Sequence, residues 1–352
     1  MSTLKDRTVR LAHLISEYLN SEGIDMWLEY GAALGGVREG GIITGDLDID
    51  FGIWWKDWGR FRNMILQAQR SREVGGPLYE IASSIPFAFD FRTFPAFEHK
   101  SFPLGGEVCK IKVRDPSVEL KVDNPRYTDS LYLEIYGFEE FNNVKSSPIN
   151  YGSSYRSKLY YHKNLKQIKF EGFDFYVSKY VEKYLDYIYK DVGGEGMTWR
   201  TPTEEKGEKL IHSWYNEDKV TGYVEGVFDL FHKGHLRLLK RANKIFDKVL
   251  AAVTPDDIVK TYKDKLPVIP FEDRKEMLES CKYIDEVITG SPTLIPTINW
   301  MEENGIDYIV AGRSKESPID KWYSEIINEE RLLLLDETPD YHTADLIKKI
   351  SI

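Results

Sequence analysis

A turn between a strand and a helix in the second half of the chain constrains the fold most. Residues 220–227 are rich in β-branched and aromatic side chains, which is typical of a buried strand. Residues 236–245 carry apolar side chains at helical spacing. The turn between them contains His232, Gly234 and His235. Because a helix N-terminus offers unpaired N–H groups and imidazoles can donate hydrogen bonds, this turn predicts a site for nucleotide phosphates. The alternative is that both histidines only cap or pack the loop.

The elements after this turn predict a parallel sheet. An apolar strand at 248–254 follows the helix, and this order indicates a right-handed crossover in a doubly wound sheet. Ligands bind such sheets beyond the carboxyl ends of the strands, where the turn lies. Lys260 and Lys263 are expected on a loop, where they either bind a triphosphate or form an ordinary solvated run. Further strands are expected at 282–288, 306–312 and 332–335, and a last helix at 342–346.

Residues 226–235 resemble the signature of the nucleotidyltransferases that carry a His-x-Gly-His motif. The most similar branch is the cytidylyltransferases acting on phosphocholine, phosphoethanolamine and glycerol 3-phosphate, and the resemblance covers about residues 219–352. It implies CTP and a phosphorylated small alcohol as substrates, and a homodimer supported by residues 282–288. It also implies catalytic roles for His232, His235 and Lys260. The nucleotide-binding residues that it implies are Gly226, Phe228, Asp229, Gly234, Lys263, Arg313 and Thr343.

Two departures from this family pattern concern positive charge. Glu337 stands where the family commonly has an arginine, and only Thr343 is retained from a hydroxyl-rich stretch before the last helix. Residues 312–315 replace a Gly-Asp-Asp-Trp motif of the family. Arg313, within this second departure, is the candidate to supply the missing positive charge.

The first half of the chain contains a run of alternating acids. Asp46, Asp48 and Asp50 alternate with apolar residues, so a strand would place three carboxylates on one face. Such carboxylates repel one another unless a cation lies among them, and Mg²⁺ on a diphosphate is the usual solution. The alternative is a polar edge strand with solvated acids. Upstream, the small residues of 31–36 predict a turn and helix start where a ligand or the backbone comes close.

The small-residue turn and the acid strand together resemble the LicD/fukutin-like phosphotransferases, and the match extends in pieces over residues 10–207. Thr44 and Gly45 replace the usual Pro and Trp of the family motif. The resemblance implies catalytic roles for Asp48 and Asp50. The ligand-binding residues that it implies are Gly31, Gly35 and Arg38, and the metal ligands are Asp46, Asp48, Asp50 and Glu134.

Other segments of the first half are less specific. A helix is expected over 4–19, and residues 86–103 have the composition of a loop. Lys110, Lys112 and Arg114 alternate in an expected strand, where they either contact phosphates or, more commonly, form a solvated face. The aromatic residues of 54–103 either cage a quaternary ammonium or form core.

These patterns predict an α/β protein of two domains. An α+β nucleotidyltransferase-like domain is expected at 1–215 and a doubly wound Rossmann-like domain at 216–352, since 352 residues suffice for two cores. The net charge of −10 argues against a nucleic-acid partner. Two cysteines in different halves indicate a reducing compartment. With no signal core and no apolar run of spanning length, a cytoplasmic protein is expected.

The two resemblances together imply a bifunctional enzyme. The second domain would join CTP to a phospho-alcohol, and the first would transfer the phospho-alcohol from the resulting CDP-alcohol to a hydroxyl of a cell-surface glycan, with Mg²⁺ as its cofactor. Two alternatives stay open at this point. One domain could be catalytically inactive and serve binding or regulation, or the first domain could transfer a nucleotide to its acceptor.

Overall fold

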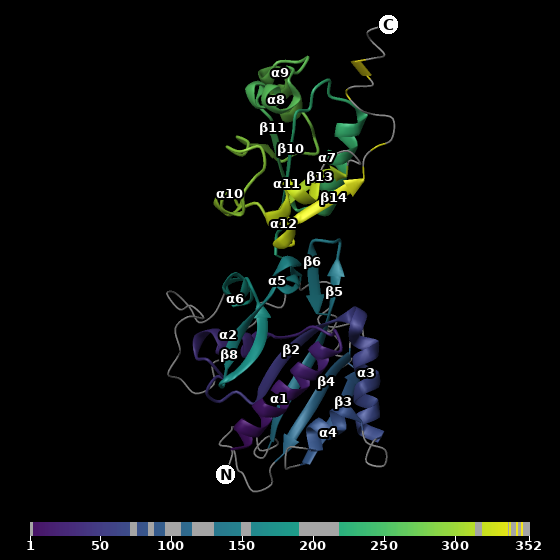
Figure 1. Cartoon of the computed structure of the whole chain (residues 1–352), viewed down its shortest axis with the longest axis vertical. Coiled ribbons are helices and arrows are strands. Elements are labelled where there is room, and N and C mark those ends of the chain that lie inside the picture. The colour runs from purple at the N-terminus through teal and green to yellow at the C-terminus, as the bar shows by residue number, and fades with distance from the viewer. Residues whose placement is uncertain are drawn as a thin grey trace. The chain divides into compact units, whose positions relative to one another are not determined.

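The computed structural model describes residues 3–70, 76–83, 88–95, 107–114, 130–148, 156–189, 218–313 and 319–336, together with residues 338, 343, 346 and 347. The chain divides into two compact units (Figure 1). The first comprises Met1–Phe141 and Lys145–Asp218. The second comprises Lys219–Ile352 and the short segment Asn142–Val144.

The first unit is built on a mixed sheet whose strands lie in the order β1, β2, β5, β4, β3. β2 and β5 are parallel neighbours, whereas the other pairs along this order are antiparallel. β6 pairs with β5 and β7, and β8 and β9 form a separate two-stranded sheet. The strands are Met26–Leu28 (β1), Asp48–Trp54 (β2), Ala88–Pro95 (β3), Glu107–Arg114 (β4), Ser130–Phe141 (β5), Lys145–Pro148 (β6), Ser157–Lys158 (β7), Leu165–Phe170 (β8) and Phe173–Ser178 (β9).

The helices of this unit begin where the local sequence favours them. α1 starts at a capping box in which Thr3 and Asp6 exchange hydrogen bonds of 2.8 and 3.0 Å. Its apolar stripe is buried, with Leu11 and Ile15 at most 1% exposed, as the helical spacing predicted. The helices are Leu4–Ser21 (α1), Tyr30–Arg38 (α2), Trp55–Arg70 (α3), Pro77–Ser83 (α4), Tyr160–Lys163 (α5) and Val181–Ile188 (α6).

The second unit is a parallel five-stranded sheet with the order β12, β11, β10, β13, β14. The chain builds outward from β10 to β12, then returns to the other side of β10 with β13 and β14. This reversal creates the crevice in which doubly wound sheets bind ligands, and it confirms the predicted α/β class. The strands are Thr221–Gly226 (β10), Lys248–Val253 (β11), Glu286–Val287 (β12), Tyr308–Arg313 (β13) and Leu332–Asp336 (β14).

The helices of the second unit connect these parallel strands. They are Lys233–Ile245 (α7), Asp256–Lys263 (α8), Phe271–Glu279 (α9), Ile298–Glu303 (α10), Ile319–Trp322 (α11) and Ser324–Asn328 (α12). A buried cluster that includes Tyr223, Leu250 and Met301 joins the sheet to α10. The core thus lies between sheet and helices, and it leaves the carboxyl ends of β10 and β13 for the crevice.

Several local predictions were wrong. Residues 88–95 form strand β3 and not a loop. β2 begins at Asp48, so Asp46 precedes the strand that was expected to include it. Lys260 and Lys263 lie in the last turn of α8 and not on a loop, because Pro255 and two following acids give that segment a favourable helix start. Residues 190–207, the end of the range that resembles the LicD/fukutin-like phosphotransferases, lie outside the described residues.

Across the described ranges, none of the helices has both the length and the apolar character needed to cross a membrane.

Candidate functional sites

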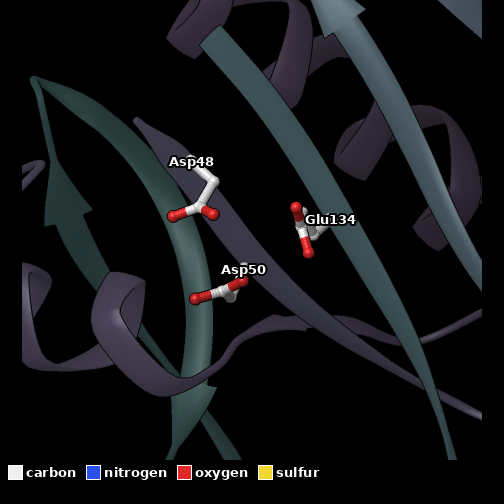
Figure 2. Close-up of side chains that lie close together, drawn as sticks. All are labelled: Asp48, Asp50 and Glu134. Carbon is white, nitrogen blue, oxygen red and sulfur yellow. The ribbon is translucent and has the colours of Figure 1, made fainter. Parts of the chain in front are cut away.

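An acidic cluster lies on neighbouring strands of the first unit. Asp48 and Asp50 come from β2, and Glu134 comes from β5 directly opposite Asp50. One carboxylate oxygen from each residue lies within 4.8 Å of the others. Figure 2 shows the three carboxylates gathered over the two strands. The cluster forms because residues two apart on a strand share a face, and because β2 and β5 pair in this register.

The start of α2 borders this cluster. A Cβ atom on Gly31 would lie 3.0 Å from an Asp46 carboxylate oxygen and 3.7 Å from one of Asp50. Glycine is therefore needed here for the close approach of the helix to the acids. Asp46 itself accepts a hydrogen bond of 3.0 Å from the Leu47 amide, and it lies beside the group of three carboxylates without being part of it.

The acids strongly perturb one another. Burial raises the pKa of Asp48 to about 8, and repulsion from Asp46 adds to this rise. Burial also raises the pKa of Asp50 well above its ordinary value, with repulsion from Asp48 and Glu134 next in importance. The pKa of Asp46 is raised mainly by burial as well. Burial and mutual repulsion therefore favour the protonated forms of these three aspartates.

Two side chains satisfy Glu134. Lys110 on β4 forms an ion pair with its Oε1, and the Tyr136 hydroxyl donates a hydrogen bond of 2.8 Å to its Oε2. Glu134 is 8% exposed, so both partners contact a nearly buried carboxylate. The sequence predicted Glu134 only through the family resemblance, and its partner Lys110 was identified only as one of several alternating basic residues.

The other residues predicted for the site of this unit, Gly35 and Arg38, have local structural contacts. Gly35 packs on the loop after α2, where a Cβ atom would lie 2.3 Å from the Gly41 carbonyl oxygen. The Arg38 side chain is 5% exposed and pairs with Glu39 at 2.6 Å. Tyr189 was not singled out from the sequence, yet its pKa is raised well above the ordinary value by burial and then by the charges of Asp50 and Asp46. No sequence pattern marks this tyrosine.

In the second unit, the predicted turn connects the end of β10 to the start of α7. Phe228 and Leu230 adopt left-handed backbone conformations, with φ of 52° and 46°, which turn the chain sharply. His232 caps α7, and its Nδ1 accepts a hydrogen bond of 3.1 Å from the Gly234 amide. The His232 and His235 rings stack with centroids 3.8 Å apart. The chain thus places both imidazoles at the helix N-terminus.

Thr343 also reaches this turn. Its Oγ1 lies 3.3 Å from His232 Nε2 and donates a hydrogen bond of 3.3 Å to the Asp229 carbonyl oxygen. Residues 111 positions apart in the sequence therefore meet at one end of the sheet. Phe228 is buried at 3% exposure and packs edge-on against His235, so it supports the imidazole from within the core.

The Asp229 carboxylate builds the loop around the turn. It accepts hydrogen bonds of 3.1 Å from the Leu230 amide, 2.9 Å from the Val268 amide and 3.0 Å from the Ile269 amide. Its oxygens are thus occupied by backbone donors, and the segment after α8 is held against the turn. Gly226 ends β10, and a Cβ atom added to it would lie 3.3 Å from the Phe228 ring.

Arg274 of α9 supports the same loops. Its fully buried guanidinium donates to the carbonyl oxygens of Val227, Thr254 and Ile269, with a distance of 2.9 Å to Ile269. It also forms an ion pair with Asp256. One side chain thereby joins the turn, the end of β11 and the start of α8.

Burial favours the neutral form of the His235 imidazole. Burial lowers the pKa of His235 to about 3, and repulsion from His232 and Lys263 contributes. Desolvation by surrounding protein atoms lowers the pKa of Lys263, followed by repulsion from Lys265. Lys260, also on α8, is exposed. Arg313, at the end of β13, is 63% exposed and lies 3.5 Å from an Asp336 carboxylate oxygen.

A pocket of about 140 Å³ opens at the carboxyl end of β10, beside Ile309 and Val310 of β13. Glu225, the residue before Gly226, lines it and accepts a hydrogen bond of 2.6 Å from the Tyr223 hydroxyl. Burial raises the pKa of Glu225. The aromatic residues of the wall are Tyr223, Tyr262, Trp322 and Tyr323.

The cage of aromatic residues considered for the first half does not form from Trp54, Trp58 and Phe61, because these side chains are buried in the core.

Two family models match the chain. The model described as cytidylyltransferase-like matches residues 223–350, and the model described as the LicD/FKTN/FKRP nucleotidyltransferase domain matches residues 23–85. The first covers the turn and the pocket. The second covers α2, Asp46 and β2, but not Glu134.

Curated relatives match parts of the chain. The FAD synthase of Pyrococcus horikoshii is 39% identical over 77 residues, which are 22% of this chain and 52% of that protein. A probable choline-phosphate cytidylyltransferase of Schizosaccharomyces pombe is 34% identical over 134 residues, or 37% of either chain. An ethanolamine-phosphate cytidylyltransferase of Arabidopsis thaliana is 32% identical over 136 residues, which are 36% of this chain and 32% of that protein. The chain spans about half or less of the length of these relatives. It therefore joins a LicD/FKTN/FKRP-type nucleotidyltransferase segment to a cytidylyltransferase-like domain, as the two sequence resemblances predicted.

Proposed function

We propose that the second unit makes a CDP-alcohol from CTP and a phospho-alcohol that carries a cationic amine. The observation that carries this proposal is the pocket of Glu225 and four aromatic residues at Gly226, the residue from which the signature turn starts. A carboxylate among aromatic faces attracts an ammonium group by charge and by cation–π interaction. This favours phosphocholine or phosphoethanolamine over glycerol 3-phosphate, whose alcohol has no positive charge.

The proposed first reaction is a displacement at the α-phosphorus of CTP. A phosphate oxygen of the phospho-alcohol forms the new P–O bond, the bond to the β-phosphate breaks, and pyrophosphate leaves. His232 Nδ1 accepts the Gly234 amide, so its proton lies on Nε2, where it can donate to a phosphate oxygen. His235, neutral because of its lowered pKa, is a second donor of the same kind. Lys263 and Arg313 would neutralise the remaining charge of the triphosphate.

The proposed second reaction takes place in the first unit. A hydroxyl oxygen of a glycan acceptor attacks the phosphorus on the alcohol side of the diphosphate, the bond to CMP breaks, and CMP leaves. The hydroxyl proton would pass to an ionised carboxylate of the cluster. Asp48, Asp50 and Glu134 fit Mg²⁺, because oxygen ligands from all three converge within 4.8 Å. Magnesium bound there would neutralise the diphosphate.

The test is product analysis with the full chain. The enzyme is incubated with CTP, Mg²⁺ and phosphocholine, phosphoethanolamine or glycerol 3-phosphate, and products are identified by ³¹P NMR and mass spectrometry. We expect pyrophosphate and a CDP-alcohol with the two amines. Turnover with ATP but not CTP, or a preference for glycerol 3-phosphate, contradicts the proposal for the second unit.

The same experiment with a glycan acceptor tests the first unit. An added mass equal to the phospho-alcohol supports the proposal, whereas an added nucleotide indicates nucleotidyl transfer by the first unit.

A matched pair of variants tests the pocket. Glu225→Gln should lower kcat/KM for phosphocholine about tenfold or more, since a partly buried cation loses its charged partner. Glu286→Gln, at an exposed position on β12, should leave it unchanged. Light scattering checks the homodimer, which stays a prediction.

A further inference from the structure

A row of charged side chains crosses three strands at the acidic cluster. Lys110 on β4 lies directly opposite Glu134 on β5, and Glu134 lies directly opposite Asp50 on β2. Directly opposite residues share one face of a sheet. The row therefore reads acid, acid, base from β2 to β4, on the face that carries the candidate metal ligands.

Lys110 neutralises the most enclosed part of this row. Its ammonium group pairs with Glu134 Oε1, while the Tyr136 hydroxyl occupies Oε2. A nearly buried carboxylate needs such partners, because an unpaired buried charge is strongly unfavourable. Lys110 also acts on Asp48, where its charge opposes the rise in the pKa caused by burial. The lysine thus faces two of the three proposed metal ligands.

We propose that Lys110 is the resident counter-ion of the cluster and that it competes with the divalent cation for Glu134. The inference rests on the proposed function, through the metal site. An ammonium group and a divalent cation repel at such short range, so Glu134 pairs fully with one or the other. Lysine suits this exchange because its charge sits on a flexible four-carbon stem. Lys110 therefore holds the acids together without metal and lowers their affinity for it.

Lys112 provides a matched control on the same strand. It lies two residues from Lys110, on the same face, opposite Tyr132 on β5 and Asp90 on β3, and so not opposite any of the three candidate metal ligands. Its ammonium group lies 5.7 Å from the centre of the Tyr132 ring. Replacing Lys112 removes the same charge from the same strand without removing the partner of Glu134.

The test measures Mn²⁺ binding to the full chain by electron paramagnetic resonance of the free ion, without nucleotide. We expect Lys110→Gln to bind Mn²⁺ about three- to tenfold more tightly than the wild type, because a repelling charge is removed from the site. Lys112→Gln should stay within about twofold of the wild type, since its ammonium group lies at the Tyr132 ring and not at Glu134. Lys110→Arg, which keeps the charge, should not bind more tightly. Asp48→Asn should lose the site.

The outcomes separate the two proposals. If the wild type has no Mn²⁺ site that Asp48→Asn removes, the metal centre of the proposed function is wrong, and the counter-ion role is wrong with it. If that site exists but Lys110→Gln binds no more tightly than Lys112→Gln, only the counter-ion role is wrong. A second measurement covers loss of stability. Saturating Mn²⁺ should raise the melting temperature of Lys110→Gln by more than that of the wild type, and an equal rise contradicts the inference.

Discussion

Replacing Arg274 by methionine should uncouple the signature turn from the rest of the second unit. The guanidinium is fully buried and donates to the carbonyl oxygens of Val227, Thr254 and Ile269 while pairing with Asp256. Methionine fills much of the same space but satisfies none of these acceptors. The substitution therefore leaves three backbone carbonyls and one carboxylate without their shared partner.

The magnitude follows from these contacts. The Asp256 carboxylate is 37% exposed and stays solvated, so the loss comes mainly from the three carbonyl oxygens. Leaving a buried acceptor without its donor costs about 1–3 kcal/mol, and with partial recovery through water we expect about 3–5 kcal/mol in all. Since a domain has a free energy of unfolding of about 5–15 kcal/mol, the second unit would lose a large fraction of its stability. At about 4 °C per kcal/mol for a domain of this size, its melting temperature should fall by about 12–20 °C. The first unit makes none of these contacts, so its transition should not move.

Arg331 provides the control within the same unit. Its side chain is 1% exposed, and it donates to the carbonyl oxygens of Ile306 and Asp307, with 2.7 Å to Asp307, while pairing with Glu302. Ile306 and Asp307 precede β13, and Arg331 precedes β14, so these contacts lie at the amino ends of the strands. The turn, in contrast, follows the carboxyl end of β10. Arg331→Met should therefore cost a similar amount of stability without displacing His232.

Calorimetry and nucleotide turnover together check this prediction. At a temperature where both variants are folded, Arg274→Met should lower CDP-alcohol synthesis about a hundredfold, because small displacements of catalytic groups have effects of this size. Arg331→Met should keep near wild-type turnover. Equal losses of turnover in the two variants would show that activity follows stability alone, and a shift of only 1–2 °C in Arg274→Met would refute the energetic reasoning.

Three further predictions concern the two sites. His235→Ala should lower CDP-alcohol synthesis about a hundredfold or more, because a hydrogen-bond donor to the phosphate is lost. The variant should still modify an acceptor when CDP-alcohol is supplied, whereas loss of both activities in folded protein would indicate one composite site. Because the pKa of Asp48 is raised to about 8, the stability of the metal-free protein should fall as the pH rises from about 4 to 8, and the affinity for Mg²⁺ should increase with the same rise in pH. A melting temperature that does not depend on pH in the presence of chelator contradicts this. Arg313→Gln should raise KM for CTP about tenfold in steady-state assays, whereas an unchanged KM would exclude a triphosphate contact.

The local pattern of the sequence predicted the elements that carry the chemistry. Strand, turn and helix around His232 were predicted from side-chain type and spacing, and so was the shared face of Asp48 and Asp50. These features depend on residues close in sequence, where strand and helix periodicity operate. The doubly wound class of the parallel sheet followed from the alternation of strands and helices, because right-handed crossovers allow few other arrangements.

The partners of these residues depend on pairing between distant segments. Lys110 meets Glu134 only because β4 and β5 align in one register, and a shift by one residue would turn Lys110 to the opposite face. Arg274 belongs to a charged segment that indicates an exposed helix start, yet carbonyl oxygens from three loops bury it. Glu225 is one residue from the predicted turn, but its aromatic neighbours come from other elements. No local signal predicts such convergence.

The two sites divide recognition between them under the proposed function. In the described residues of the second unit, a carboxylate and aromatic rings line a pocket suited to the head group of the alcohol. In the first unit, the described cluster consists of acids and Lys110, groups that act on the diphosphate shared by every CDP-alcohol. Head-group selection would then occur when the CDP-alcohol is made, and the second reaction would accept what the first supplies. Consequently, substitution of Glu225 should change which CDP-alcohol accumulates without changing which CDP-alcohol the first unit consumes.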